Sequence, residues 1–99
     1  MTQLEICEEI SALIDGLYNG TVHFGSNDKF RLKKYKCFFH PTDVLLSVYD
    51  DVELSVKGMD EDVSRERLVK LRDDLQQIRT DFKFTALQQP IDHLTEIIG

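Results

Sequence analysis

Residues 44–56 read VLLSVYDDVELSV, and this stretch decides the predicted fold class because it favours a sheet in the middle of the chain. Valine or leucine stands at every even-numbered position except Asp50, as expected for one face of a β-strand. Two geometries satisfy the pattern. The stretch is either one long strand with a bend at Asp50, or a hairpin whose loop, 49–51, pairs Val48 with Val52. Both predict a sheet.

The segment before this stretch alternates as well. The turn-rich residues 25–29 separate two alternating runs, which predicts a β-hairpin that pairs Phe24 with Phe30. The phase of the alternation changes at residues 33–34, where a β-bulge would reconcile the two faces. Residues 40–43, which contain a proline, then form the next turn.

Helices are predicted on both sides of the sheet. Residues 3–18 carry an apolar stripe at helical spacing, with a Thr2–Glu5 capping box before it and Asn19-Gly20 as a left-handed stop. A second stripe steps by three and four residues through Leu68, Leu71, Leu75, Ile78 and Phe82. Acidic residues 60–62 suit the start of that helix. Phe82, Phe84 and Ala86 alternate as a short strand would, and a last helix begins at Pro90.

The predicted fold class is therefore α+β. It consists of an N-terminal helix, a three- or four-stranded antiparallel sheet, and two C-terminal helices packed on the sheet. The 99 residues contain no linker or repeat, so we expect a single domain over 1–99. The expected order of elements is similar to that of some small phage-encoded inhibitors, including certain anti-CRISPR proteins. That resemblance, which covers element order alone, implies an inhibitor from a phage or another mobile element that acts against host defence.

Motifs for catalysis or cofactor binding are missing from the sequence. It has no glycine-rich phosphate loop, no glycine-flanked nucleophilic serine and no helical pair of metal-binding histidines, so we expect no enzyme and no cofactor. The Cys37-x-x-His40 spacing is half of a zinc site, with Cys7, His23 or His93 as conceivable partners. Structural zinc needs four ligands and no second pair exists, so no metal is expected.

The compartment is predicted from the termini and the cysteines. The first residues lack the basic and apolar regions of a signal peptide, and no segment reaches the length of about 20 apolar residues that spans a bilayer. Two cysteines do not make a disulfide framework. We therefore expect a cytoplasmic protein without a disulfide.

Charge is arranged in blocks along a chain with a net charge of −6. Residues 43–62 hold seven acids against Lys57 alone, and these acids form the candidate protein-binding set: Asp43, Asp50, Asp51, Glu53, Asp60, Glu61 and Asp62. Residues 29–36 are basic with aromatic residues between the bases, and they form the alternative nucleic-acid-binding set: Lys29, Arg31, Lys33, Lys34, Tyr35 and Lys36. The acidic balance of the chain opposes nucleic acid, so the first set is favoured.

The predicted function is a small acidic, non-enzymatic protein-binding domain that acts as an inhibitor or adaptor. Its expected partner is another protein with a basic surface, and no membrane contact is expected. A homodimer through Leu68, Leu71, Leu75 and Ile78 is a further expectation. The alternatives are a nucleic-acid-binding regulator that uses the basic strand 29–36, and an accessory subunit of an enzyme.

Overall fold

The regular elements of the chain are helical. The computed structural model describes residues 1–25, 32–36, 38–58 and 62–99, and no β-strand occurs within these ranges. Its α-helices are α1 (Gln3–Asn19), α3 (Pro41–Glu53), α4 (Arg65–Phe82) and α5 (Gln88–Ile98). Shorter elements join them: the 3₁₀ turns η1 (Lys33–Tyr35) and η3 (Thr85–Leu87), and the π-helical turn η2 (Leu54–Gly58).

The predicted α+β fold is wrong, and residues 44–56 show why. Residues four apart lie on one face of an α-helix and also share even or odd numbering, so a helical stripe can pass for strand alternation. Val44, Val52 and Val56 are buried on such a stripe. Leu45 and Tyr49, which a strand would turn to the opposite face, are also fully buried. The stretch is α3 and η2, neither a long strand nor a hairpin.

The other predicted strands and turns are corrected in the same way. The bulge placed at residues 33–34 is the start of η1, and the turn placed at 40–43 is the start of α3. Val22 and Phe24 pack against the core without forming a strand, whereas Phe30 lies outside the described residues. Residues 82–86 are the end of α4 followed by η3. The resemblance to small phage-encoded inhibitors was based on the order of strands and helices. It no longer holds, because the described residues contain no strand.

The three helices predicted from apolar stripes are confirmed. The capping box between Thr2 and Glu5 is formed at the start of α1, and Gly20 ends that helix with a left-handed φ of 82°. The Leu68–Phe82 stripe lies on α4 and is buried. The last helix begins two residues before Pro90, which is buried in its first turn.

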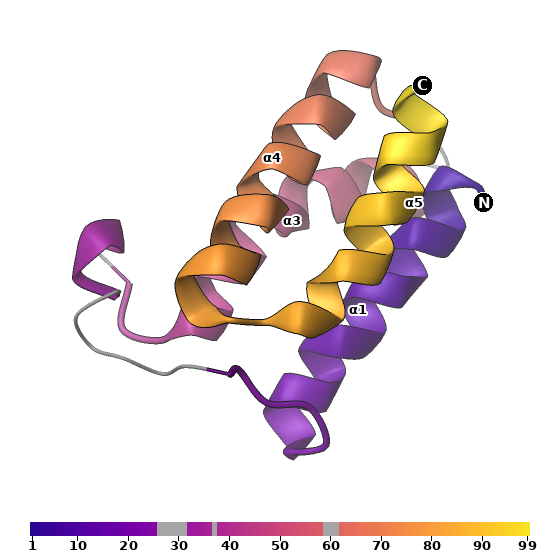
Figure 1. Ribbon diagram of the computed structural model, residues 1–99. Helices are drawn as coiled ribbons and strands as arrows, with labels where there is room; N and C mark the ends of the chain where they lie inside the picture. The colour runs from indigo at the N-terminus through magenta and orange to yellow at the C-terminus, as the bar shows by residue number, and fades with distance from the viewer. Residues whose placement is uncertain (26–31, 37, 59–61) are drawn as a thin grey trace.

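The four α-helices surround one hydrophobic core and alternate in direction along the chain (Figure 1). The helix α4 packs most extensively against α5, and α3 also packs against α4. The helix α1 closes the arrangement by contacting both α5 and α3. As a result, α3 lies between α1 and α4, with its outer side left uncovered by any other described α-helix.

The apolar stripe of α4 that was expected to form a homodimer is part of this core. Leu68, Leu71, Leu75 and Ile78 are each at most 5% exposed, because α3 and α5 cover that face of α4. A homodimer through these four side chains would require this core to open.

Polar contacts fasten the ends of the helices to one another. The Gln3 side chain exchanges two hydrogen bonds with the backbone of Val63, and Arg65 Nε donates to the carbonyl oxygen of Ile98 at 3.0 Å. Midway along the bundle, His93 Nδ1 of α5 lies 2.8 Å from Glu9 Oε2 of α1.

None of the helices in the described part of the chain has the length and apolarity needed to cross a membrane.

Candidate functional site

The candidate site is built on α3, whose start is set by local sequence. His40 is the N-cap, and its Nδ1 accepts a hydrogen bond from the backbone N–H of Thr42 at 3.1 Å. Pro41 occupies the first turn, where its missing N–H costs nothing. Asp43 places a carboxylate near the positive end of the helix dipole. These signals fix where α3 begins.

The outer side of α3 carries acidic and apolar residues together. Helical spacing aligns them in a row, which we name the α3 ridge: Asp43, Leu46, Ser47, Asp50, Asp51 and Leu54. Asp50 and Asp51 are exposed, and Leu54, just after the end of α3, is 68% exposed. The ridge therefore presents carboxylates with apolar side chains between them, the composition that a partner combining basic and apolar groups would match.

Two of the ridge carboxylates have no ionic partner among the described residues. Asp51 pairs with Arg67 of α4, whose Nη2 lies 2.5 Å from the carboxylate. Asp43 and Asp50, by contrast, make no ion pair with any described residue. Just beside the ridge, Glu53 is 3.5 Å from Lys57 and accepts a hydrogen bond from Ser11. The negative field of the ridge is therefore only partly neutralised by the chain itself.

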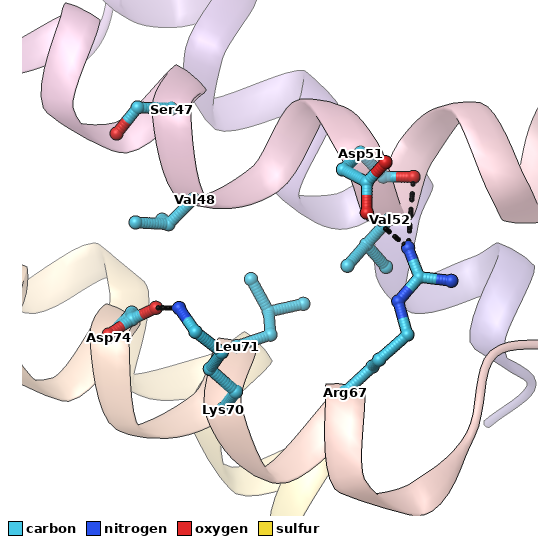
Figure 2. Close-up of a pocket in the computed structure, with 8 residues that line it drawn as sticks. All are labelled: Ser47, Val48, Asp51, Val52, Arg67, Lys70, Leu71 and Asp74. Carbon is cyan, nitrogen blue, oxygen red and sulfur yellow. Dashed lines mark hydrogen bonds and ion pairs between the residues drawn. The ribbon is translucent and has the colours of Figure 1, made fainter.

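An open hollow lies along each side of the ridge. The hollow between α1 and α3 has a volume of about 210 Å³, and its lining is Ser11, Ile14, Asp15, Leu46 and Glu53. The hollow between α3 and α4 has a volume of about 240 Å³. Figure 2 shows Leu71 reaching from α4 toward α3, between Val48 and Val52, while Arg67 reaches across to Asp51 and Lys70 pairs with Asp74 along α4. Each hollow can accept an apolar side chain beside a charged rim.

The structure separates the predicted acidic set into three groups. Asp43, Asp50 and Asp51 lie on the ridge, and Glu53 lines the hollow beside it. Asp62 is exposed just before α4, which begins at Arg65 with Ser64 as its N-cap, and so it does not cap that helix. Residues 60 and 61 of the set are outside the described residues.

The predicted basic set is divided as well. Lys29 and Arg31 lie outside the described residues, while η1 and the residue after it hold Lys33, Lys34, Tyr35 and Lys36. The described part of this set is not a strand. Lys34 Nζ lies 3.2 Å from Asp81 of α4, and the Tyr35 ring stacks on Phe82 with 5.7 Å between ring centroids. Lys34 and the aromatic ring of the set are thereby engaged within the chain.

The carboxylate of Asp81 anchors η1 to the end of α4. Burial raises the pKa of this carboxyl group, but hydrogen bonds from Tyr35, Gln77 and Lys34 outweigh that effect and hold the pKa below its usual range. Asp81 is therefore an ionised acceptor near neutral pH. Burial, followed by the Asp81 carboxylate itself, raises the pKa of Tyr35, so its hydroxyl stays protonated and donates.

Of the residues considered as metal ligands together with Cys37, the structure describes Cys7, His23, His40 and His93. Cys37 is outside the described residues, and His40 uses Nδ1 to cap α3. Cys7 is buried beneath α3, and burial raises its pKa, which disfavours the thiolate form that binds metal. Within the described residues, no three His, Cys, Asp or Glu side chains are grouped so that they could hold an ion.

Sequence reasoning missed the apolar part of the site and the cation beside it. Leu46 and Leu54 were assigned to one face of a strand, whereas Leu46 is half-buried on α3 and Leu54, just after α3, is exposed. Arg67 was not connected to Asp51, 16 residues earlier. The signal that could have revealed the ridge is the i, i+4, i+8 spacing of Leu46, Asp50 and Leu54.

Comparison of the chain with protein families, curated proteins and solved structures finds no match.

Proposed function

We propose that this chain is a non-enzymatic protein-binding domain that presents the α3 ridge to a basic surface of another protein, and so acts as an inhibitor or adaptor. The observation that carries the proposal is that Asp43 and Asp50 lack ionic partners among the described residues, on a face that also exposes Leu54. Surface carboxylates speed encounter with a basic partner, and the apolar side chains between them slow dissociation.

The geometry favours binding over catalysis. The ridge brings carboxylates to an open surface beside two hollows, a form that suits docking of a partner better than enclosure of a substrate. A role as the accessory subunit of an enzyme remains compatible with this surface, because such a subunit also works by docking. The proposal therefore concerns the docking surface, and the activity of the partner is a separate question.

The alternative proposal, a nucleic-acid-binding regulator, has weaker support. It requires bases and an aromatic ring to be presented together. Lys34 is paired with Asp81, and the Tyr35 ring is stacked against Phe82. Of the predicted set, the exposed bases in the described part are confined to η1 and Lys36. This surface is small beside the acidic one.

The experiment for the proposal compares two charge-reversal variants in affinity capture from the native host. The ridge variant Asp50→Lys/Asp51→Lys and the control Asp92→Lys/Glu96→Lys change net charge equally, and the control alters exposed residues of α5. A partner that acts through the ridge should be recovered with wild type and with the control but not with the ridge variant. Purified partner should then associate more slowly with the ridge variant. Equal loss in both variants would show that only net charge matters and would contradict the proposal.

A further inference from the structure

A second exposed surface lies at the end of the molecule where α4 finishes and α3 begins. We name residues 32–36 and 38–40 the hook. Phe39 is 93% exposed, and beside it a hollow of about 230 Å³ is lined by Leu32, Lys33, Lys36 and Phe38. The hook contains three lysines and no acid. It therefore combines an exposed aromatic anchor with positive charge, the chemical complement of the α3 ridge.

The hook is held in place by contacts at its base. The hydroxyl of Tyr35 and Nζ of Lys34 both donate to Asp81, and the Tyr35 ring packs on Phe82. Figure 1 shows η1 standing away from the four α-helices at that end of the molecule. Because its base is anchored, binding a partner through its tip would require little ordering of the chain around η1.

The hook cannot reach the far end of the ridge of its own chain. Phe39 lies two residues before Pro41, whereas Leu54 follows the last residue of α3. The 13 residues of α3 rise about 1.5 Å each, which separates the two ends by roughly 20 Å. A hook that contacts the Asp50–Leu54 end of a ridge must therefore come from a different molecule.

We propose that the hook of one copy of this chain docks on the α3 ridge of a second copy. Phe39 enters the hollow between α1 and α3 at the part lined by Glu53, away from the start of α3, and Lys36 lies near the carboxylates of Asp50 and Glu53. The inference rests on the proposed function, because it uses the ridge as a protein-binding surface. It goes further by naming an occupant: a basic, aromatic segment of the same protein.

The contact is head-to-tail, so it has consequences that a symmetric dimer lacks. Each docked pair leaves one hook and one ridge unoccupied, and further copies can add to both ends. The net charge of −6 on each copy opposes association, so the assembly should be weak and concentration-dependent. Physiological ionic strength limits that repulsion to about 8 Å while leaving direct contacts in place.

The test is complementation between two variants in sedimentation equilibrium at physiological salt. The hook variant is Lys36→Glu/Phe39→Ser, the ridge variant is Asp50→Lys/Glu53→Lys, and Tyr18→Ser removes another exposed aromatic as a control. Wild type and the control should rise in average mass with concentration. Each variant alone should stay at the 11.5 kDa monomer, and their mixture should form a complex that stops at two chains, because only one intact hook and one intact ridge remain. Unchanged melting temperatures establish that both variants fold.

Other outcomes overturn the inference in distinguishable ways. Wild type that stays monomeric over the whole concentration range contradicts self-docking, and if the ridge still binds a lysine-rich peptide, the proposed function survives. A mixture that fails to associate when wild type does would assign the contact to another surface. Monomeric wild type whose retention on single-stranded DNA disappears in the hook variant would assign the hook to nucleic acid instead.

Discussion

The hydroxyl group of Tyr49 on α3 donates a hydrogen bond to the main-chain carbonyl oxygen of Cys7 on α1, at 2.5 Å. The same hydroxyl lies 2.8 Å from Ser11 Oγ, and the ring is fully buried. Burial is also the main cause that raises the pKa of Tyr49, so the hydroxyl stays protonated at neutral pH. This contact sets the orientation of α3 against α1 and thereby determines which side of α3 faces solvent.

Replacing Tyr49 by phenylalanine should reduce the free energy of unfolding by about 1–2 kcal/mol, because it removes the hydroxyl while keeping the ring. The matched control is Tyr18→Phe, since Tyr18 is 67% exposed and should change stability by less than about 0.5 kcal/mol. Chemical denaturation measures both values. Equal effects for the two variants would show that the buried hydrogen bond does not hold α3 on α1.

The sequence predicts the helices whose apolar stripes cannot be mistaken for alternation. The steps of three and four from Leu68 to Phe82 include both odd and even positions, which a strand face cannot. The stretch 44–56 is ambiguous because many of its apolar residues are two or four apart. Leu45 and Tyr49 resolve the ambiguity only when both are known to be buried, and that depends on α1 and α4 covering two sides of α3.

The acidic residues of the site could be chosen from the sequence, but their grouping could not. Charge counting along the chain selected Asp43, Asp50 and Asp51, which the helix then brings to one ridge. It could not separate them from Asp62, because sequence proximity does not show that Asp62 lies just before α4 and away from the ridge. The pairing of Asp51 with Arg67 likewise depends on how those two helices cross.

Truncation of the α4 stripe tests the core. Leu75→Ala should lower the free energy of unfolding by about 2–5 kcal/mol, because Leu75 is fully buried and its loss leaves a cavity. Leu54→Ala, on the exposed ridge, should cost less than about 0.5 kcal/mol. The midpoints of urea-induced unfolding of the two variants, each compared with wild type, measure these losses. A loss of less than about 1 kcal/mol for Leu75→Ala would show that Leu75 is not buried and would contradict the position of α4.

The lowered pKa of Asp81 predicts how the stability of the protein depends on pH. Its folded-state pKa lies below the unfolded value of about 3.9, so its stabilising contribution is complete above that pH and is lost as pH falls through the folded pKa. The stability difference between wild type and Asp81→Asn should therefore be constant near neutral pH and shrink under acid conditions. Thermal melts from neutral to acidic pH give the difference, with Glu96→Gln on α5 as a control that stays near zero. A difference that grows on acidification would contradict the assignment.

Zinc should leave the protein unaffected. His40 already accepts the Thr42 N–H through Nδ1, and His93 is engaged with Glu9. Neither belongs to a group of three or more His, Cys, Asp or Glu side chains that could hold an ion among the described residues. Added zinc and a chelator should each leave the melting temperature unchanged, and elemental analysis should find less than one zinc per chain. One zinc per chain, removed by the chelator with a drop in melting temperature, would show a site that includes Cys37.

The measurement that tests the proposed binding surface most directly is an amide NMR titration with a lysine-rich peptide that also carries leucine and phenylalanine. The α3 ridge should give the largest shift changes, at Asp43, Asp50 and Leu54, and these should disappear in Asp50→Lys/Asp51→Lys. The α5 variant Asp92→Lys/Glu96→Lys should retain them. Shift changes spread equally over α5 and the ridge, or equal weakening in both variants, would contradict the account, because the peptide would then respond to net charge and not to the face of α3.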